Sequence, residues 1–315
     1  MTISATIIAD SVCAATGERL TSLLLEYPRF IHGEFMTHRE ISKNSSSSRA
    51  IPVVTMIDQI GRDTAMPIHW GKAQKGMQAR EEHDAPIEWK NGFFSPQEAW
   101  LLARNNACEM AMVFAQADYH KQIINRLTEP FQHMRVLATA NRWDNFFNLR
   151  LESFEGKYQA QPEIHELAIE VYRALEASEP VELRAGEWHL PFYKHGYWKL
   201  GDSTRVDVAV DISSSCSAQT SYRKLDDSEK KAREMRAKLR EGGAVHASPF
   251  EHCATPIGER TITFENGKLH VQNEMGMKGI THVTMDGVPC SGNLRNFIQY
   301  RQLLPNHYCD KFVPR

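Results

Sequence analysis

The stretch from Pro28 to Pro52 constrains the fold most, because an apolar segment leads into a polar loop within it. The stretch begins with aromatic and aliphatic residues and reaches four consecutive serines, Ser45 to Ser48, followed by Arg49. A hydrophobic core cannot absorb these hydroxyls and a guanidinium without partners. The sequence therefore predicts that the apolar segment is buried and that the serine-rich loop reaches the surface.

The side chains around this loop are typical of an anion-binding site. His38 and Arg39 precede the serines, and Arg49 follows them. Arginines donate planar, forked, charge-assisted hydrogen bonds, and serine hydroxyls add short donors beside exposed backbone N–H groups. A solvated serine-rich loop between surface arginines is the alternative. The closeness of both arginines to the serines favours phosphate binding.

The composition limits where a phosphate can bind. The chain has 315 residues, of which 42% are hydrophobic and 24% charged, and its formal net charge is −2. These values are ordinary for a globular protein of one or two domains. The net charge gives no general attraction to nucleic acid or to an anionic membrane, so phosphate binding must be local and a nucleic-acid-binding module is disfavoured.

The sequence also indicates a cytoplasmic protein without a membrane partner. No apolar run approaches the roughly 20 residues of a membrane span. The first ten residues lack a basic region and end in Asp10, so we interpret them as a β-strand and not as a signal peptide. Six cysteines without a C-x-x-C pair indicate free thiols in a reducing compartment. His252-Cys253 and His307-x-Cys309 lack zinc-site spacing, so we expect no metal.

The local patterns predict an α/β, or α+β, fold. Residues 62–95 are rich in Gly, Pro and aromatic residues without a clean period, which is typical of a lid or an oligomer arm. Residues 95–98, Ser-Pro-Gln-Glu, form a helix-start signal. Apolar and small residues at three- and four-residue steps then predict a helix with one buried face to about Ile124. A second aromatic and turn-rich segment covers residues 182–201.

Further elements are predicted in the second half of the chain. Apolar and acidic residues alternate over residues 206–212, which favours a half-buried strand. Helices are predicted to begin at Gln161 and at Ser228 and to cover residues 293–304. A hairpin is expected over residues 261–271, where Asn-Gly supplies the turn.

Arg150 is a ligand candidate on physical grounds. It ends the otherwise largely apolar segment 143–150. An arginine in an apolar helix is costly to bury unless an anion or an acceptor meets it. The alternative is a surface arginine that pairs with Glu152 or Glu155.

The stretch around the serines resembles a signature of the flavin-dependent thymidylate synthase family. That signature is Arg-His-Arg, seven residues, and then Ser. Here it is matched by Thr37-His38-Arg39, seven residues, and Ser47. Thr37 replaces the first arginine, and Ser45 replaces a glutamate that the family usually has two residues before the motif serine.

A second patch resembles a helix pair of the same family. Residues 143–150 followed by residues 160–165 are similar to Asn-x-Arg-x-x-x-x-Phe-Leu-x-Leu-Arg and then Ala-Gln-x-Glu-Ile-Arg. Arg126 and Pro130 resemble an Arg-x-x-x-Pro motif that precedes this pair.

A third patch resembles the family's Pro-Phe-Glu-His motif, which follows an Ala-x-x-x-Ser-Tyr segment. Here residues 248–252, Ser-Pro-Phe-Glu-His, follow a Ser-Tyr segment that ends at residue 222. In the family these segments come before the Arg-His-Arg motif, whereas here they come after it. The chain therefore resembles a divergent, circularly permuted and viral-type member.

The resemblance implies a single synthase-like domain over residues 1–315, with insertions at 62–95 and 182–201. Its fold would be an antiparallel or mixed sheet flanked by long helices. FAD and dUMP would bind at the subunit interfaces of a homotetramer. Methylenetetrahydrofolate, a reduced folate, would donate a one-carbon unit to C5 of dUMP to give dTMP, with NADPH as a candidate reductant of the flavin.

The resemblance also assigns roles to single residues. The catalytic residues would be Ser47, Arg150 and His252. The residues that bind dUMP would be Glu34, Ser47, Arg49, Arg126 and Arg150. The residues that bind FAD would be His38, Arg39, Asn145 and His252.

Thr37 and Ser45 leave two alternatives open. A related enzyme could finish the transfer with water and give hydroxymethylated dUMP or dCMP, which would suit a viral protein that makes modified DNA. A relative could instead keep the nucleotide site without catalysis. A methyl or hydroxymethyl group on the product separates the first alternative from the synthase, and bound-flavin absorption argues against the second.

Overall fold

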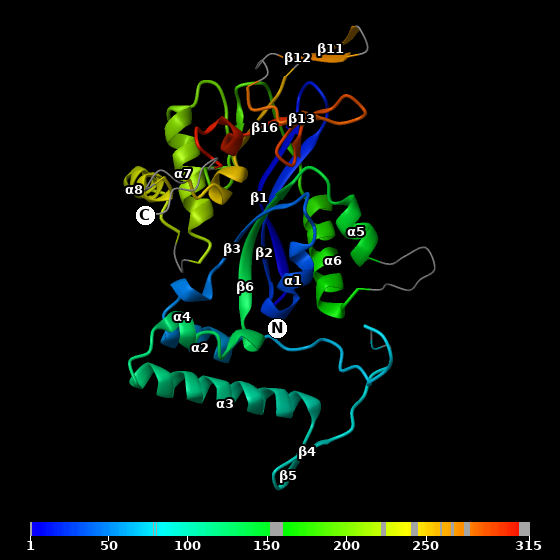
Figure 1. Cartoon of the computed structure of the whole chain (residues 1–315), viewed down its shortest axis with the longest axis vertical. Coiled ribbons are helices and arrows are strands. Elements are labelled where there is room, and N and C mark those ends of the chain that lie inside the picture. Colours follow the sequence, from blue (N-terminus) through cyan, green and yellow to red (C-terminus); the bar gives the residue numbers. More distant parts are fainter. Residues whose placement is uncertain are drawn as a thin grey trace.

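The structure is a computed structural model, and it has a mixed α/β fold with several sheets and helices (Figure 1). It describes residues 2–308 apart from 78, 80, 152–159, 222–224, 241–244, 259, 266–267 and 274–277.

The largest sheet has five strands in the order β3-β6-β2-β1-β7. Its strands are β1 (Ser4–Cys13), β2 (Arg19–Pro28), β3 (Ser42–Ser45), β6 (His133–Ala140) and β7 (Val181–Leu183). Strand β2 pairs antiparallel with both β1 and β6, and β6 pairs antiparallel with β3. Strand β7 pairs with β1 in parallel. The predicted first strand and a mixed sheet are therefore confirmed.

Three helices lie along this sheet: α1 (His32–Met36), α5 (Asp144–Arg150) and α6 (Pro162–Glu176) (Figure 1). The helix α6 begins where the sequence predicts, because proline suits a first helical position. Its Ile164, Leu167 and Val171 follow one helical face, and they are fully buried in one cluster with Leu25 and Val136 of the sheet. This core anchors the strands that carry the candidate site.

A second sheet has the strand order β16-β10-β8-β9 and lies with two helices in the upper part of Figure 1. Its strands are β8 (Trp188–His189), β9 (Tyr197–Trp198), β10 (Ala254–Pro256) and β16 (Phe297–Gln299). The helices are α7 (Val206–Ala218) and α8 (Glu229–Leu239), and Ser228 caps α8 as predicted.

Two predictions in this region are wrong. Residues 206–212 belong to α7 and not to a half-buried strand. The helix is buried on several sides, since Ala209, Val210 and every residue from Ile212 to Ser217 are buried, so no one-face pattern marked it in the sequence. Residues 293–304 form β15 (Leu294–Arg295), β16 and the 3-10 helix η6 (Tyr300–Leu303) and not an α-helix. Asn296 lies between these strands at a φ of 55°, which an α-helix does not allow.

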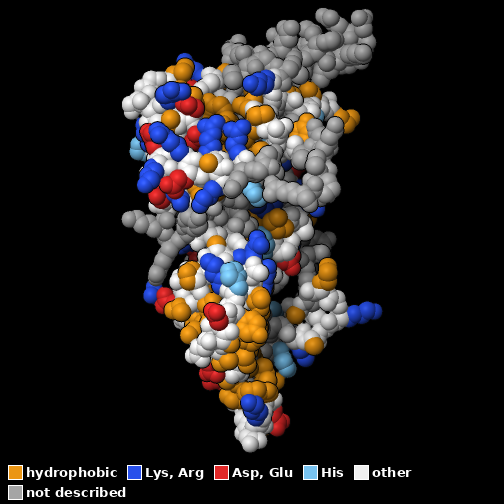
Figure 2. Space-filling model, turned by 60° about the vertical axis from the view of Figure 1, so that its left-hand side comes forward, with side chains coloured by type: hydrophobic (Ala, Val, Ile, Leu, Met, Phe, Trp, Pro, Cys, Tyr) orange, Lys and Arg blue, Asp and Glu red, His pale blue; other side chains and the backbone are white. Residues whose placement is uncertain are grey.

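The lower end of the molecule in Figure 1 contains α2 (Val53–Arg62), α3 (Pro96–Gln116) and α4 (Lys121–Ile124). Ser95 caps α3 in a capping box with Glu98, which confirms the helix start. The predicted buried face is wrong, because Ala111 is the one α3 residue in the buried class, and Met110 and Val113 are 48% and 55% exposed. Hydrophobic side chains gather over this tapered end in Figure 2.

The remaining elements are short. Residues 62–95 lead to a hairpin of β4 (Ile87–Trp89) and β5 (Gly92–Phe94). The predicted hairpin strands are confirmed as β11 (Arg260–Glu265) and β12 (Lys268–Asn273), and their Asn-Gly turn lies outside the described residues. Two short strands and four 3-10 helices complete the described elements that the text has not yet named: β13 (His282–Val283), β14 (Pro289–Ser291), η1 (Arg29–Ile31), η2 (Ser48–Ala50), η3 (Glu129–Phe131) and η5 (Ser248–Glu251). Among the described helices, none is both long enough and apolar enough to cross a bilayer.

Candidate functional site

A small pocket lies where β6 passes into α5, and we call it the His38 pocket. Its volume is about 210 Å³, and its lining includes Thr37, His38, Arg39, Arg142 and Asn145. The first three of these residues follow α1, whereas Arg142 and Asn145 come from the β6–α5 segment. The structure thus brings together three residues predicted to bind FAD, which lie in two separate sequence patches.

Arg150 contacts His38 of this pocket and lies near Glu34, and both Arg150 and Glu34 are predicted to bind the nucleotide. Arg150 Nε donates a hydrogen bond to His38 Nε2 at 3.3 Å. Burial, together with the charges of Arg150 and Lys43, lowers the pKa of His38 to about 4, so this imidazole is neutral near pH 7. Burial lowers the pKa of Arg150, and the nearby Glu34 carboxylate opposes that shift.

One buried polar atom beside His38 is left without a partner. Glu34 Oε2 is buried and has no hydrogen-bond partner. The side-chain hydrogen bond described for Arg150 comes from Nε, and its alternative partners Glu152 and Glu155 lie outside the described residues. Buried polar groups are normally paired, so an unpaired acceptor beside a guanidinium is typical of a ligand site.

The serine loop, residues 45–49, begins at the end of β3 and is fixed by the protein on two sides. Ser46 N donates to Arg135 O at 2.8 Å, and Arg135 N donates to Ser46 Oγ at 3.0 Å. Ser47 N donates to Ser221 Oγ at 2.7 Å. These hydrogen bonds fix the backbone that carries the side chains of the loop.

The helix α4 adds a cation that the sequence analysis missed. Lys121 Nζ donates to Ala50 O at 2.9 Å, directly after the exposed Arg49. Asn125 Nδ2 donates to Ser48 O at 2.7 Å and holds the same segment. No local sequence signal marks Lys121, because its contact joins residues 71 positions apart.

Arg126 lies at the same end of β3 as the serine loop. Its Nη1 donates to Glu129 Oε1 at 2.7 Å, and its side chain is 55% exposed. Arg29 pairs with the same carboxylate oxygen at 2.9 Å, and Ser48 Oγ donates to it at 3.4 Å. Glu129 therefore connects Arg126 to the loop and offsets part of its charge.

The two groups of residues predicted to bind dUMP lie at opposite ends of β3. Ser42 pairs with Thr139 and Ser45 with Val136, so the two ends of β3 face the two ends of β6. At about 3.4 Å per residue, the five steps from Ile41 to Ser46 span about 17 Å. The two groups start from backbone positions about 17 Å apart. The structure therefore separates Glu34 and Arg150 from Ser47, Arg49 and Arg126.

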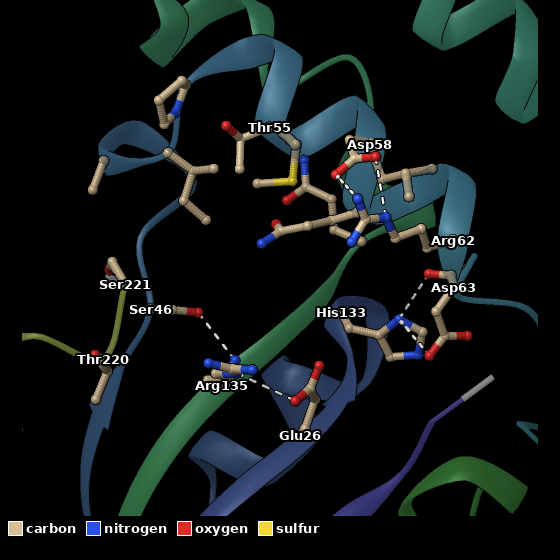
Figure 3. A pocket seen from close by; sticks show the side chains of 17 residues that line it. Glu26, Ser46, Thr55, Asp58, Arg62, Asp63, His133, Arg135, Thr220 and Ser221 are labelled. Carbon is tan, nitrogen blue, oxygen red and sulfur yellow. Dashed lines mark hydrogen bonds and ion pairs between the residues drawn. The ribbon is translucent and has the colours of Figure 1, made fainter. Parts of the chain in front are cut away.

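A larger pocket of about 550 Å³ lies beside the serine loop, under α2, and we call it the α2 pocket. Figure 3 shows hydroxyl side chains on one side of it and charged pairs on the other. The hydroxyls belong to Ser46, Thr220 and Ser221. The pairs are Arg135 with Glu26 and Arg62 with Asp58. Because these arginines already contact carboxylates, the pocket offers less free positive charge than the loop itself.

His252 is buried at the end of η5 and does not line the His38 pocket. Its Nδ1 is hydrogen bonded to Thr139 Oγ1 at 2.8 Å, and its Nε2 is buried without a partner. Burial, with a smaller effect of His189, lowers the pKa of His252 to about 3.

Two further polar residues of this region were missed by the sequence analysis. Asn44 Nδ2 donates to Ser217 O, and Ser248 Oγ donates to Asn44 Oδ1 at 3.1 Å, so Asn44 joins the first and third patches. Arg142 lines the His38 pocket and lies 3.9 Å from Glu18. Both residues are visible in the sequence, but their partners are distant along the chain.

The described cysteines are all free, as predicted, and Cys309 lies outside the described residues. Burial raises the pKa of Cys216 to about 12 and that of Cys253 to about 11, so both thiols are unreactive near pH 7. Among the described residues, no three His, Cys, Asp or Glu side chains lie together so that they could hold a metal ion.

Comparison with known proteins gives a limited likeness. No protein-family model matches the chain, and no curated protein matches it. Among solved structures, the UMP/dUMP methylase PolB from Streptomyces cacaoi bound with 5-Br dUMP is similar at 14% identity and a TM-score of 0.40, over 55% of this chain and 90% of that chain. The same methylase bound with 5-Br UMP gives 15% identity and a TM-score of 0.39, over 55% and 89%. At these values the likeness carries no argument about fold or activity.

Proposed function

We propose that this chain is a flavin-dependent enzyme that transfers a one-carbon unit to C5 of a deoxypyrimidine monophosphate, converting dUMP to dTMP. The observation that carries the proposal is the hydrogen bond from Arg150 to His38, close to Glu34. Arg150 and His38 lie 112 positions apart, in the two patches that resemble synthase motifs. They meet beside Glu34 Oε2, a buried acceptor without a partner.

Glu34 and Arg150 together match one edge of a uracil ring. That edge presents an N–H group between two carbonyl oxygens, so its complement is an acceptor with neighbouring donors. Glu34 Oε2 is such an acceptor, and the Nη groups of Arg150 are such donors. In the proposed complex these two residues orient the pyrimidine, and neutral His38 holds Arg150 in place.

The serine loop binds the phosphate in this proposal. Arg49 and Ser47 supply charged and hydroxyl donors, and Lys121 adds a second cation beside Ala50. Arg126 contributes less, because Glu129 already pairs with it.

The residues of the His38 pocket fit an acceptor-rich anion such as FAD. Thr37, Arg39, Arg142 and Asn145 all carry donors at its lining. Its volume of about 210 Å³ lies below the roughly 300–1,000 Å³ of typical ligand pockets, so one chain encloses only part of the cofactor. When bound, the flavin supplies reducing equivalents, methylenetetrahydrofolate supplies the carbon, and NADPH is a candidate reductant.

A second copy of the chain completes the site in this proposal. The Arg150 end and the serine-loop end are about 17 Å apart along β3, and this separation favours a site in which each end meets the opposite end of a neighbouring subunit. The exposed apolar side chains of α3 and α4, which include Met110, Val113 and Ile123, offer a surface for that subunit. We therefore propose a homo-oligomer, with a homotetramer as the expected form.

Visible absorption spectroscopy tests the proposal first. The purified protein is measured with and without added FAD and is then titrated with dUMP. We expect a bound-flavin spectrum that shifts when dUMP is added. Absence of flavin binding under all conditions would reject the synthase and favour a nucleotide-binding relative without catalysis.

The product decides between the synthase and a hydroxymethylase. Thr37 lines the His38 pocket at a position where the family motif has an arginine, so this pocket has one cation fewer. Mass spectrometry of the product from dUMP and dCMP distinguishes a methyl from a hydroxymethyl group. We expect dTMP from dUMP, and hydroxymethylated dUMP or dCMP would establish the alternative.

A further inference from the structure

A series of buried hydrogen bonds runs through the core from Ser11 to His252, and we call it the Ser11–His252 relay. Ser11 Oγ is bonded to His189 Nδ1 at 2.9 Å, and His189 Nε2 to Ser22 Oγ at 2.8 Å. Ser22 Oγ is bonded to Thr139 Oγ1 at 2.5 Å, and Thr139 Oγ1 to His252 Nδ1 at 2.8 Å. All five residues are fully buried, and they come from β1, β8, β2, β6 and the end of η5.

Both imidazoles of the relay are neutral near pH 7. Burial lowers the pKa of His189 and of His252 to about 3. A neutral imidazole carries one N–H, so its two nitrogens are one donor and one acceptor. The relay then holds five protons for four hydrogen bonds, so one proton is left over, either on His252 Nε2 or on the hydroxyl of Ser11, Ser22 or Thr139.

In the first arrangement every hydroxyl of the relay donates to the next member. Ser11 donates to His189 Nδ1, His189 Nε2–H to Ser22, Ser22 to Thr139, and Thr139 to His252 Nδ1. The His252 proton then lies on Nε2. One group is left without a partner, and it is this N–H.

In the other three arrangements His252 carries its proton on Nδ1 and donates to Thr139. The leftover proton then lies on Ser11, Ser22 or Thr139, and none of these hydroxyls has a further acceptor in the described part of the chain. Two buried groups stay unpaired and not one, namely this hydroxyl and His252 Nε2. The cost of a buried unpaired hydroxyl disfavours each of these arrangements by about tenfold or more.

We infer that the relay fixes His252 as a neutral imidazole with its proton on Nε2, so that this buried nitrogen is a hydrogen-bond donor and not a general base. Ser22, Thr139 and His189 are positioning residues, because they act on the ligand only through His252. The relay begins at the fully buried Ser11 and cannot take up a replacement proton, so it orients His252 and does not conduct protons.

The acceptor that this N–H meets depends on the proposed function, but the position of the proton does not. In the flavin-dependent enzyme the acceptor is a ring carbonyl oxygen or a ring nitrogen of the flavin. A donor held at that atom stabilises negative charge that develops there on reduction.

Nuclear magnetic resonance of the full chain labelled with ¹⁵N-histidine tests the inference without any ligand. Long-range ¹H–¹⁵N correlations distinguish the two tautomers, and His189→Gln and His252→Gln assign the signals. We expect both imidazole rings to be neutral, with the proton on Nε2, from pH 8 to pH 5. A His252 signal from the Nδ1–H form, or protonation of either ring near pH 6.5, would overturn the inference.

A pair of variants tests the role of the relay itself. Thr139→Val removes the hydroxyl with little change in shape, and Thr139→Ser keeps it. We expect a second His252 signal from the Nδ1–H form in Thr139→Val and an unchanged spectrum in Thr139→Ser. A pure Nε2–H spectrum in Thr139→Val would show that the relay does not set the tautomer, and the wild-type spectrum decides the matter if Thr139→Val fails to fold.

Addition of FAD separates this inference from the proposed function. We expect the His252 Nε2–H resonance to shift in the wild-type protein when FAD binds. If FAD does not bind while the tautomer is the expected one, the proposed function fails and the proton position stands. If FAD binds and this resonance does not move, His252 is not the donor to the flavin.

Discussion

Arg150 is the residue whose removal tests the site most directly. Arg150→Ala removes the donors that face the proposed pyrimidine and leaves Glu34 without its nearest opposite charge. Hydrogen bonds from charged groups contribute about 1.5–3 kcal/mol, so we expect dUMP to bind about 10- to 100-fold more weakly by calorimetry. Arg173→Ala is the control, because Arg173 is exposed and pairs with Glu170 on α6. Unchanged dUMP affinity in Arg150→Ala would contradict the assignment.

The same substitution changes a second residue in a predictable direction. The Arg150 charge is one cause of the lowered pKa of His38. Its removal therefore raises the pKa of His38 above about 4, towards the ordinary histidine value. A histidine titration by NMR measures this shift in Arg150→Ala, with Arg173→Ala again as the control. A His38 pKa that falls or stays constant would show that the contact is absent in solution.

The buried histidines make stability depend on pH. His189 and His252 have pKa values of about 3 in the folded chain, against about 6.5 for an ordinary histidine. Below pH 6.5 the unfolded chain binds protons that the folded chain cannot, so the free energy of unfolding falls with pH, by up to about 1.4 kcal/mol per unit and per histidine. Above pH 6.5 this contribution is constant.

Urea unfolding at pH 7.5, 6.5, 5.5 and 5.0 measures that dependence. We expect a loss of stability below pH 6.5 in the wild-type protein and a shallower loss in His189→Gln, which has one buried histidine fewer. Equal stability at pH 7.5 and pH 5.0 would contradict the buried neutral state of both rings.

At the scale of elements, the sequence predicts where helices begin better than which of their residues are buried. Ser95 with Glu98 predicts the start of α3, and Gln161 with Pro162 predicts the start of α6, because caps are local. The α7 segment was misassigned because Asp207 and Asp211 alternate with apolar residues over a short window. Tertiary packing buries this helix on several sides, from Ala209 to Ser217 except Asp211, so it carries no one-face period that a sequence pattern could detect.

The exposed face of α3 leads to a prediction about assembly. The helix is apolar on several sides and yet largely exposed, and Val113 at 55% exposure lies on the open face. Val113→Glu is expected to reduce the assembly to smaller species in sedimentation velocity. The monomer should lose no more than about 0.5 kcal/mol of stability, because the side chain is exposed.

Gln97→Glu is the matched control for α3, because it adds the same charge at an exposed polar position of this helix. We expect its sedimentation to equal that of the wild type. A wild-type protein that is monomeric at micromolar concentration, or a Val113→Glu variant that sediments like the wild type, would show that α3 is not the interface.

At the scale of the whole molecule, the sequence suggests some residues of the candidate site but not their arrangement. His38, Arg39 and Asn145 meet in one pocket, which two motif patches suggested. Lys121 and Arg142 could not be found from local patterns, because their contacts join distant segments. The separation of Arg150 from Arg49 depends on the pairing of β3 with β6, and no spacing in the sequence encodes that register.

This separation leads to a prediction about mixed assemblies. If each site takes Arg150 from one subunit and Arg49 from another, then Arg49→Ala and Arg150→Ala each damage every site in a uniform oligomer. A mixed oligomer, obtained by co-expression with two different tags, contains some sites in which both arginines are intact. We therefore expect each variant alone to have little one-carbon transfer to dUMP and the doubly tagged mixture to regain a measurable fraction of wild-type activity. The double variant Arg49→Ala/Arg150→Ala co-expressed with wild-type chain is the control. In a composite site, each site between a wild-type and a double-variant chain lacks one arginine, whereas a site within one chain stays intact in the wild-type subunit. A mixture of the single variants that stays as inactive as either alone, while the control is active, would place both arginines in the site of one chain and would contradict the composite site.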